Sequence, residues 1–309
     1  MIITLTMNPA LDKTLEVDNL SLGRLNRVQN IKVDAGGKGI NVSKMIDCLG
    51  GESLATGFIG GESGDELLKI VKNMGLKQDF IKIVGTTRTN IKVLDKINGI
   101  TELNEPGITL SKQDEKNICD KLEQLASPEV IFVLSGSLPI GVEGDFYQRL
   151  IVLLKAKGAK IFLDADGEAF GCGVEARPNY IKPNLAELTQ YFQVSEDISL
   201  LKIKELCLKL IDSGIEIVTV SMGKKGAMFV TAQKAFYAPG LEVEASSTVG
   251  AGDSMVGALA YAFEQKMPLE KAMRLSLAAS VGAVMTEGTK PPTRELVAEL
   301  KGRVKLVEV

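Results

Sequence analysis

Apolar and polar positions alternate differently in the two halves of the chain. In the second half, four short runs are apolar on both faces and bounded by polar or glycine residues, at 130–135, 160–164, 215–221 and 227–231. Such runs are typical of buried, largely parallel strands. Two longer segments, 144–158 and 199–214, have helical periodicity and end in glycine. This β-α-β order predicts an α/β fold in which helices cover a central sheet as a three-layer sandwich.

The first third of the chain has a different pattern. Its short candidate strands alternate apolar and polar residues, at 14–20, 27–35, 90–96 and 100–106. This alternation is typical of antiparallel strands with one exposed face, and Asn98-Gly99 is a hairpin turn signal. We therefore expect a small sheet, built from about 12–35 and 88–108, that projects from the main sheet as a lid. No repeat or Pro/Ser-rich linker occurs, so residues 1–309 are predicted to form one domain with this excursion.

Composition restricts the chemistry. The formal net charge of −3 does not suggest a nucleic-acid-binding surface. No apolar run reaches the roughly 20 residues of a membrane span, and the first residues lack a signal-peptide pattern. The four cysteines are scattered and predicted to be reduced thiols, so we expect a cytoplasmic protein with no membrane partner. Because the chain has no histidine, a Ser-His-Asp triad, a Cys-His dyad and a His-ligated zinc site are excluded.

The segment Gly250-Ala251-Gly252-Asp253 precedes a helical pattern marked by Val256, Leu259, Ala260 and Phe263. The first N–H groups of a helix have no partner within it and lie at its positive end, and glycine lets a ligand approach them closely. The segment can therefore form an anion hole with a carboxylate beside it. The structural alternative is that Asp253 only caps the helix.

A second glycine-rich segment, 35–44, has the same form. Gly36 and Gly37 precede another helical pattern, and Lys38 and Asn41 make the turn polar and closely approachable. A flexible turn without function is the alternative. No P-loop occurs anywhere in the chain, and no G-x-G-x-x-G follows a strand, so a nicotinamide-dependent enzyme is disfavoured.

Three other polar segments follow predicted strands. In 181–188, Asn184 and Glu187 form either a capping box or a ligand pair at the carboxyl end of a strand, where open α/β sheets bind ligands. Segment 220–227 reads as a hairpin, and 134–139 is small and hydroxylated. Arg88 lies beside the lid strands and is suited to binding phosphate through paired hydrogen bonds.

Together these segments resemble the PfkB/ribokinase family of carbohydrate kinases over essentially the whole chain. The two signatures are AGGKGINVS (35–43) and STVGAGDSMVGA (247–258), and KPNLAE (182–187) and SMGKKGA (221–227) lie between them in the family's order. The resemblance implies a ribokinase-like three-layer α/β/α sandwich with a small β-sheet lid. It also implies an ATP-dependent phosphotransferase that uses Mg²⁺.

The resemblance also implies a role for each matching position. Asp253 would be the base, and the amides of Gly250, Ala251 and Gly252 would form the anion hole. The sugar hydroxyls would contact Asp12, Gly36, Gly37, Lys38 and Asn41. A phosphate already on the substrate would contact Arg88 and Ser137, helped by Lys38 and Arg24. ATP would be bound by Lys182, Asn184, Ser221, Gly223 and Gly226, with Glu187 reaching Mg²⁺ through water.

Three segments, TMNPALDKT (6–14), SGSLP (135–139) and TRTNIKV (87–93), are most similar to family members that phosphorylate sugar phosphates. The implied substrate is fructose 1-phosphate, which would give fructose 1,6-bisphosphate. Tagatose 6-phosphate is second, with fructose 6-phosphate as a further alternative. A non-catalytic sugar-phosphate sensor on the same scaffold is disfavoured by the presence of Asp253, Asn184 and Glu187 together. Because exposed strand edges promote pairing, two lids are expected to pair in a homodimer.

Overall fold

The computed structural model describes residues 1–309. The strands are β1 (Ile2–Thr6), β2 (Ala10–Val17), β3 (Asn30–Gly36), β4 (Ser53–Ile59), β5 (Lys77–Gln78), β6 (Ile81–Lys82), β7 (Arg88–Asp95), β8 (Gly99–Asn104), β9 (Ile131–Ser135), β10 (Lys160–Asp164), β11 (Tyr180–Ile181), β12 (Ile217–Ser221), β13 (Gly226–Val230), β14 (Ala235–Pro239) and β15 (Val307–Glu308). The helices are α1 (Lys38–Cys48), α2 (Gly61–Asn73), α3 (Lys112–Leu125), α4 (Phe146–Ala156), α5 (Gly167–Glu175), α6 (Leu185–Tyr191), α7 (Leu200–Asp212), α8 (Ala251–Glu264), α9 (Leu269–Val284) and α10 (Arg294–Arg303), with a short 3₁₀ helix at Gly223–Lys225. None of the helices combines the length and apolar character needed to cross a bilayer.

The main sheet has eleven strands in the order β15-β14-β13-β12-β11-β10-β9-β1-β4-β5, with β6 beside β4. Neighbours from β5 to β12 are parallel, which confirms the strands predicted at 130–135, 160–164 and 215–221. The run predicted at 227–231 is β13, but it is antiparallel to β12. Only residues 222–225 separate the two strands, which is too short for the crossover that a parallel pair needs.

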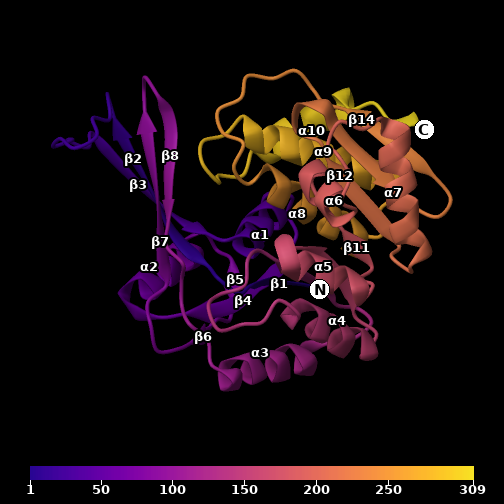
Figure 1. The fold of residues 1–309 in the computed structure, drawn as a ribbon, viewed down its shortest axis with the longest axis horizontal. Helices are drawn as coiled ribbons and strands as arrows, with labels where there is room; N and C mark the ends of the chain where they lie inside the picture. The colour runs from indigo at the N-terminus through magenta and orange to yellow at the C-terminus, as the bar shows by residue number, and fades with distance from the viewer.

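Two helical layers cover the main sheet and confirm the predicted α/β/α sandwich (Figure 1). Helices α1, α8, α9 and α10 share one buried core with the sheet, and α3, α4, α5 and α7 share the other. Along β9, Phe132 and Leu134 enter one core, whereas Ile131 and Val133 enter the other. A strand buried on both faces needs apolar side chains at successive positions, which explains the continuous apolar runs.

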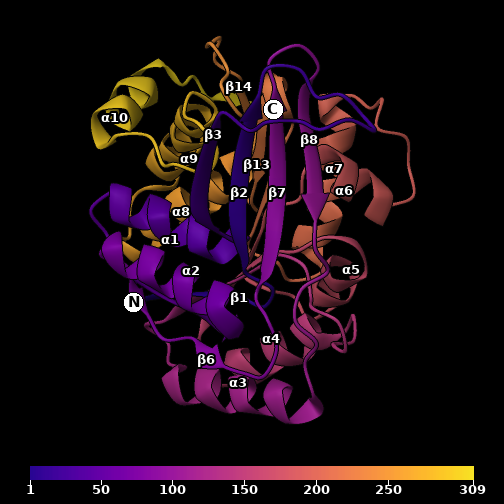
Figure 2. The same cartoon turned by 90° about the vertical axis from the view of Figure 1, so that its left-hand side faces the viewer.

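The lid is a separate four-stranded sheet in the order β3-β2-β7-β8, and it projects from the main body (Figures 1 and 2). Its two outer pairs are antiparallel as predicted, but the central pair, β2 and β7, is parallel. The prediction of a purely antiparallel lid is therefore wrong, because α1, β4 and α2 form a long connection that returns the chain in the same direction. The predicted β7–β8 hairpin is confirmed, but Asp95 pairs with Gly99, so its turn is the three residues 96–98 rather than Asn98-Gly99.

The register of the lid separates its side chains onto two faces. On the inner face, Asp12 lies beside Asp34 of β3 and Asn90 of β7. On the outer face, Leu15 lies beside Ile31 and Val93. The inner face is thus polar and the outer face apolar, as the alternation along these strands predicts.

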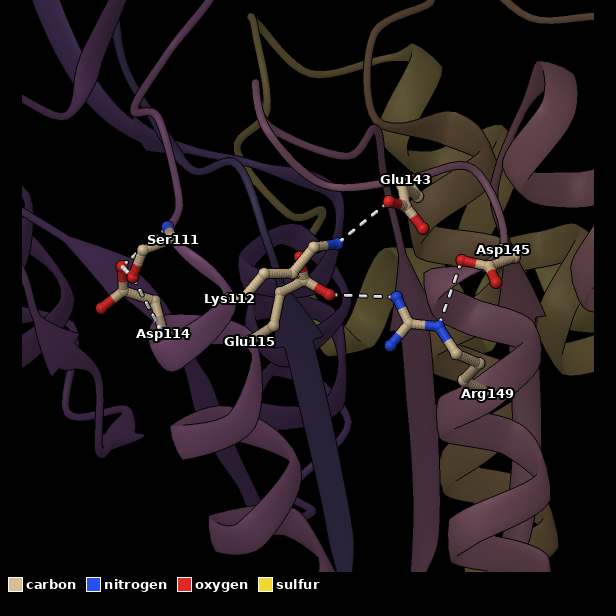
Figure 3. A network of polar contacts seen from close by, with 7 residues as sticks. All are labelled: Ser111, Lys112, Asp114, Glu115, Glu143, Asp145 and Arg149. Carbon is tan, nitrogen blue, oxygen red and sulfur yellow. Dashed lines mark hydrogen bonds and ion pairs between the residues drawn. The ribbon is translucent and has the colours of Figure 1, made fainter.

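A network of charged side chains joins α3 to α4 on the far side of the main sheet from α1 and α8 (Figure 3). Glu115 of α3 is buried and accepts hydrogen bonds from Arg149 (3.0 Å) and Lys112 (3.0 Å). Arg149 also pairs with Asp145 at 3.1 Å, and Lys112 with Glu143 at 3.3 Å. Because the buried carboxylate is paired twice, the network holds these two helices together without leaving an unsatisfied charge.

Candidate active site

Polar residues collect where the parallel strands end and where α1 and α8 begin. Asp164 is the last residue of β10, and Lys182 follows β11 directly. Helix α1 begins at Lys38 and α8 at Ala251, and the two helices pack against each other. The carboxyl edge of the sheet therefore brings together charged residues that are far apart in the sequence.

Asp253 is buried in the first turn of α8, with 7% of its surface exposed. Gly250, with φ of 78°, is the N-cap of this helix, and no side chain caps it. Instead of capping, the Asp253 carboxylate accepts a hydrogen bond of 2.8 Å from Asn41 Nδ2 of α1. The alternative that Asp253 only caps its helix is thus not supported by the structure.

Burial raises the pKa of Asp253 to about 6, and the nearby Asp164 carboxylate adds to this rise. Asn41, Lys38 and Lys182 oppose the shift by favouring the charged form. The carboxylate is therefore ionised at neutral pH, yet it is a stronger base than an ordinary aspartate.

This raised pKa has a consequence for stability. The pKa of Asp253 is above its ordinary value of 3.8, so the folded protein binds the proton more tightly than the unfolded chain. The stabilisation is complete below about pH 4 and is lost as the pH rises through about 6. Asp253→Asn is therefore expected to raise the free energy of unfolding by about 1–3 kcal/mol at about pH 7.5, and by roughly half as much at about pH 5.

Urea unfolding at these two pH values measures the difference. Asp212→Asn, the same change at the exposed last residue of α7, serves as the control and should show no such pH dependence. A variant at Asp253 that is no more stable than the parent at the higher pH would contradict the prediction.

Asp164 holds two lysines together at the centre of this site. Its carboxylate is fully buried and lies 3.3 Å from Lys182 Nζ and 3.6 Å from Lys38 Nζ. Burial alone would raise the pKa of Asp164, but the two ammonium groups outweigh it and hold the pKa below its ordinary value. Asp164 also raises the pKa of Lys38.

The backbone at the start of α8 adjoins this charged cluster. A Cβ atom on Gly252 would lie 3.2 Å from Lys182 Nζ, so the ammonium group lies directly over the helix terminus. The free N–H groups of this turn and the two lysines thus present positive potential to one small region. Such an arrangement suits a multiply charged anion.

Asp12 lies at the inner base of the lid, beside the second glycine segment. It accepts hydrogen bonds from Asn90 (3.0 Å) and Lys92 (3.4 Å). A Cβ atom on Gly36 would lie 2.6 Å from the Asp12 carboxyl group, so a larger residue there would displace the Asp12 side chain. Gly37, with φ of 119°, is the N-cap of α1, so both glycines have structural reasons to be glycine.

Arg88 is half-buried at the start of β7 and faces the polypeptide backbone. Its guanidinium donates to the carbonyl oxygens of Asn8 (3.1 and 3.3 Å) and Glu105 (3.4 Å). Two of its five N–H donors are then left for a ligand.

Ser137 is exposed just after β9. Arg24 lies in the loop between β2 and β3, beyond the far end of β2, whereas Arg88 pairs with Ala10 at the start of β2, so these two arginines lie at opposite ends of the lid.

Asn184 and Glu187 form the predicted capping box at the start of α6. The Asn184 side chain accepts from the Glu187 amide at 2.8 Å, and the Glu187 carboxylate accepts from the Asn184 amide at 2.8 Å. Burial raises the pKa of Glu187, while the hydrogen bond from Asn184 and the charge of Lys182 oppose this rise. Glu187 therefore adjoins the charged cluster while it also stabilises its own helix.

The hairpin between β12 and β13 lies beside this capping box. Ser221 forms a bridge with Asn184, and its amide donates to Pro183 at 3.1 Å. A Cβ atom on Gly226 would lie 2.0 Å from the carbonyl oxygen of Ala238, so Gly226 is required by the packing of β14. Gly223, with φ of 56°, faces open space.

Comparison with known proteins identifies the family of the chain. The family described as "pfkB family carbohydrate kinase" matches residues 5–296. The chain belongs to the pfkB family of carbohydrate kinases. It is therefore an ATP-dependent sugar kinase, of the phosphofructokinase type.

Individual members of the pfkB family match over nearly the whole chain. The chain is 35% identical to 1-phosphofructokinase of Rhodobacter capsulatus, over 97% of this chain and 95% of that one. It is 32% identical to 1-phosphofructokinase of Vibrio cholerae, over 99% and 96%. The solved structure of phosphofructokinase-2 from Escherichia coli with substrates and products superimposes with a TM-score of 0.93 at 27% identity, covering 98% of both chains.

Several residues of this pfkB kinase's site were not singled out from the sequence. Asp164 carried a detectable signal, because it ends an apolar strand at the sheet edge where α/β proteins bind ligands. Asn90 and Lys92 follow Arg88 at alternate positions, so they share its face of the strand. The sequence around Lys44 indicates only a helix. The residues that surround Lys44 come from other segments, so the sequence carries no signal for its role.

Proposed function

We propose that the chain transfers the terminal phosphoryl group of ATP to the 6-hydroxyl of fructose 1-phosphate. The observation that carries the reaction type is the buried Asp253 carboxylate beside the free amides of α8. The relatives at 32–35% identity support the choice of substrate. We further propose that residues 1–309 work as one kinase domain with the lid as its mobile part.

In the proposed reaction, the sugar oxygen forms a bond to the γ-phosphorus as the bond to the ADP oxygen breaks. The hydroxyl proton passes to Asp253. The transition state of phosphoryl transfer is loose, so Asp253 mainly orients the hydroxyl and accepts its proton late. The amides of Gly250, Ala251 and Gly252, with the Lys182 ammonium above them, would stabilise the charge on the transferred group.

The sugar would bind between the lid and α1. Asp12, held by Asn90 and Lys92, is placed to accept hydrogen bonds from sugar hydroxyls, and Asn41 lies within reach of the same region. Gly36 and Gly37 let the sugar approach the backbone. Arg88 and Ser137 would bind the phosphate at carbon 1, with Arg88 using the N–H groups that its backbone contacts leave free.

ATP would bind beside the β12–β13 hairpin, along Ser221, Gly223 and Gly226, with its phosphates near Lys182 and Asn184. Mg²⁺ prefers oxygen ligands and keeps several waters when it binds substrate phosphates. The Glu187 carboxylate fits such a site, since it adjoins the charged cluster and can reach the ion through water. Bound Mg²⁺ would neutralise charge on the transferring phosphate.

A screen of acceptors tests the substrate. Release of ADP is measured with fructose 1-phosphate, tagatose 6-phosphate, fructose 6-phosphate and unphosphorylated sugars. We expect kcat/KM for fructose 1-phosphate to be at least about tenfold above that for any other acceptor. A preference for tagatose 6-phosphate or fructose 6-phosphate would make that sugar the substrate in place of fructose 1-phosphate. Turnover of unphosphorylated sugars alone would overturn the phosphosugar assignment.

Arg88→Met extends the same assay. Loss of hydrogen bonds to a charged group is expected to raise KM for fructose 1-phosphate by at least about tenfold, with a smaller change in kcat. Arg303→Met, on the remote helix α10, is the matched control. An unchanged KM in the Arg88 variant would remove Arg88 from the phosphate site.

We also propose that two lids pair in a homodimer. The outer face of the lid exposes apolar side chains, among them Ile31 (59% exposed) and Leu103 (58% exposed). A second copy of the same face would cover them and protect the strand edges. Sedimentation velocity should show a dimer that Leu103→Glu converts to monomer. The same change at Leu201, an exposed leucine on α7 (68% exposed), should leave the dimer intact. A monomeric parent protein would rule this interface out.

A further inference from the structure

Lys44 is a buried cation that the proposed reaction does not use. It lies one turn after Asn41 on α1, and only 4% of its surface is exposed. Its ammonium group donates to the carbonyl oxygen of Ala35 (2.6 Å), to Thr289 Oγ1 (3.1 Å) and to Asn41 Oδ1 (3.2 Å). These three acceptors use all three of its N–H groups. Lys44 therefore has no donor left for a substrate.

The contact with Asn41 has a directional consequence. The carboxamide of Asn41 has an oxygen at one end and an NH₂ group at the other. An ammonium group can only donate, so Lys44 must face the oxygen. The NH₂ end is then turned toward Asp253, to which it donates at 2.8 Å.

We propose that Lys44 is a positioning residue that fixes the orientation of the Asn41 side chain, so that Asn41 donates to the Asp253 carboxylate. The opposite orientation would place the Asn41 oxygen against Asp253. That contact is favourable only when Asp253 is protonated, and a protonated Asp253 cannot accept the proton of the sugar hydroxyl. Lys44 thus keeps the base ionised without touching it. This inference rests on the proposed role of Asp253.

Other charges surround both ends of this chain of contacts. Asp253 faces Asp164 of β10, Lys38 of α1 and Lys182 beyond β11. Burial lowers the pKa of Lys44 to about 8; the charges of Asp34 and Asp12 of the lid and of Asp253 oppose this shift, and that of Lys92 adds to it. Lys44 is therefore largely protonated at neutral pH. Lys44 and Asp253 also interact directly through their charges, so the experiment has to separate this direct effect from the effect through Asn41.

The test measures how kcat/KM depends on pH. The fall of kcat/KM at low pH, the acid limb of this profile, reports the pKa of the base in the free enzyme. In Lys44→Met we expect this limb to move to higher pH by about one unit, since the amide donor to Asp253 is no longer held in place. Lys44→Gln removes the charge but keeps an N–H donor for Asn41, so its shift should be clearly smaller. Lys121→Met makes the same substitution on the remote helix α3 and should leave the limb unchanged. Phosphate groups of both substrates also titrate in this range, so variants are compared with one another under the same conditions.

A double-variant cycle shows whether Lys44 acts on Asp253 through Asn41 or through its charge alone. In an Asn41→Leu background, adding Lys44→Met should cause no further shift, because the residue through which Lys44 acts is absent. An unchanged limb in Lys44→Met would overturn the proposal. So would an equal shift in Lys44→Gln, or a shift that persists in the Asn41→Leu background, since both indicate charge alone.

Two controls keep the result interpretable. Lys44→Ala takes the place of Lys44→Met in the cycle should the methionine variant fail to fold, and the same shift is expected. Retained turnover in Asp253→Asn, or no acid limb in the parent enzyme, would contradict the proposed function itself. A parent enzyme that behaves as proposed, with no response to Lys44→Met, would contradict only the role of Lys44.

Discussion

In Asp253→Asn, turnover with ATP and fructose 1-phosphate is expected to fall by at least about 100-fold, while ATP binding is retained. Asparagine has nearly the same shape, so the start of α8 and its free amides should persist. It cannot accept a proton, however, and the hydroxyl then lacks both its orienting partner and its proton acceptor. Steady-state ADP release measures turnover, and calorimetry measures nucleotide affinity.

Asp212→Asn provides the comparison for this variant, because it makes the same change on an exposed surface and should leave turnover at the parent level. Near-normal turnover in Asp253→Asn would exclude Asp253 as the base. Loss of both turnover and nucleotide binding would instead place Asp253 in the architecture of the nucleotide site. The two measurements together therefore separate chemistry from folding.

Asp164→Asn is expected to lower the free energy of unfolding by about 3 kcal/mol at neutral pH. This substitution leaves Lys182 and Lys38 close together without the carboxylate that pairs with both. Only 6% of the Lys182 side chain is exposed, whereas the Lys38 side chain is 30% exposed and can shift outward. Because Lys38 can move toward water, we expect a loss of stability at the lower end of the range for a broken buried ion pair.

Urea unfolding of the Asp164 variant measures this loss. Asp166→Asn, two residues further along and exposed, is the control and should change stability by less than about 0.5 kcal/mol. A neutral effect of Asp164→Asn would mean that the two ammonium groups do not depend on this carboxylate. In that case the arrangement of the phosphate site would need another explanation.

The layers of the fold could be predicted from the sequence because burial on both faces leaves a strong pattern. Phe132 and Leu134 pack on one side of β9, and Ile131 and Val133 on the other, so the run is apolar throughout. The directions of the lid strands could not be predicted in the same way. Alternation reports that a strand has one exposed face, but β2 would show the same alternation beside a parallel or an antiparallel partner.

The candidate site was predictable where backbone geometry demands particular residues. Gly36 and Gly250 could be located because a close approach and a left-handed φ both require glycine. Asp164 and Lys44 were not identified, since their importance comes from neighbours contributed by other segments. Lys44 lies within an ordinary helical pattern, and only the fold shows that Asn41, Ala35 and Thr289 surround it.

The parallel pairing of β2 with β7 bears on the order in which the molecule assembles. Ala10 pairs with Arg88, and the intervening chain includes α1, β4 and α2, which must first find their places on the main sheet. Contacts so distant along the chain carry a large entropic cost of loop closure and form slowly. The two hairpins β2–β3 and β7–β8 can each form locally, but their union must wait for the body beneath them. Completion of the lid is therefore expected to be among the last steps of folding, and a nascent chain would acquire the polar inner face of its lid only after its central layers are in place.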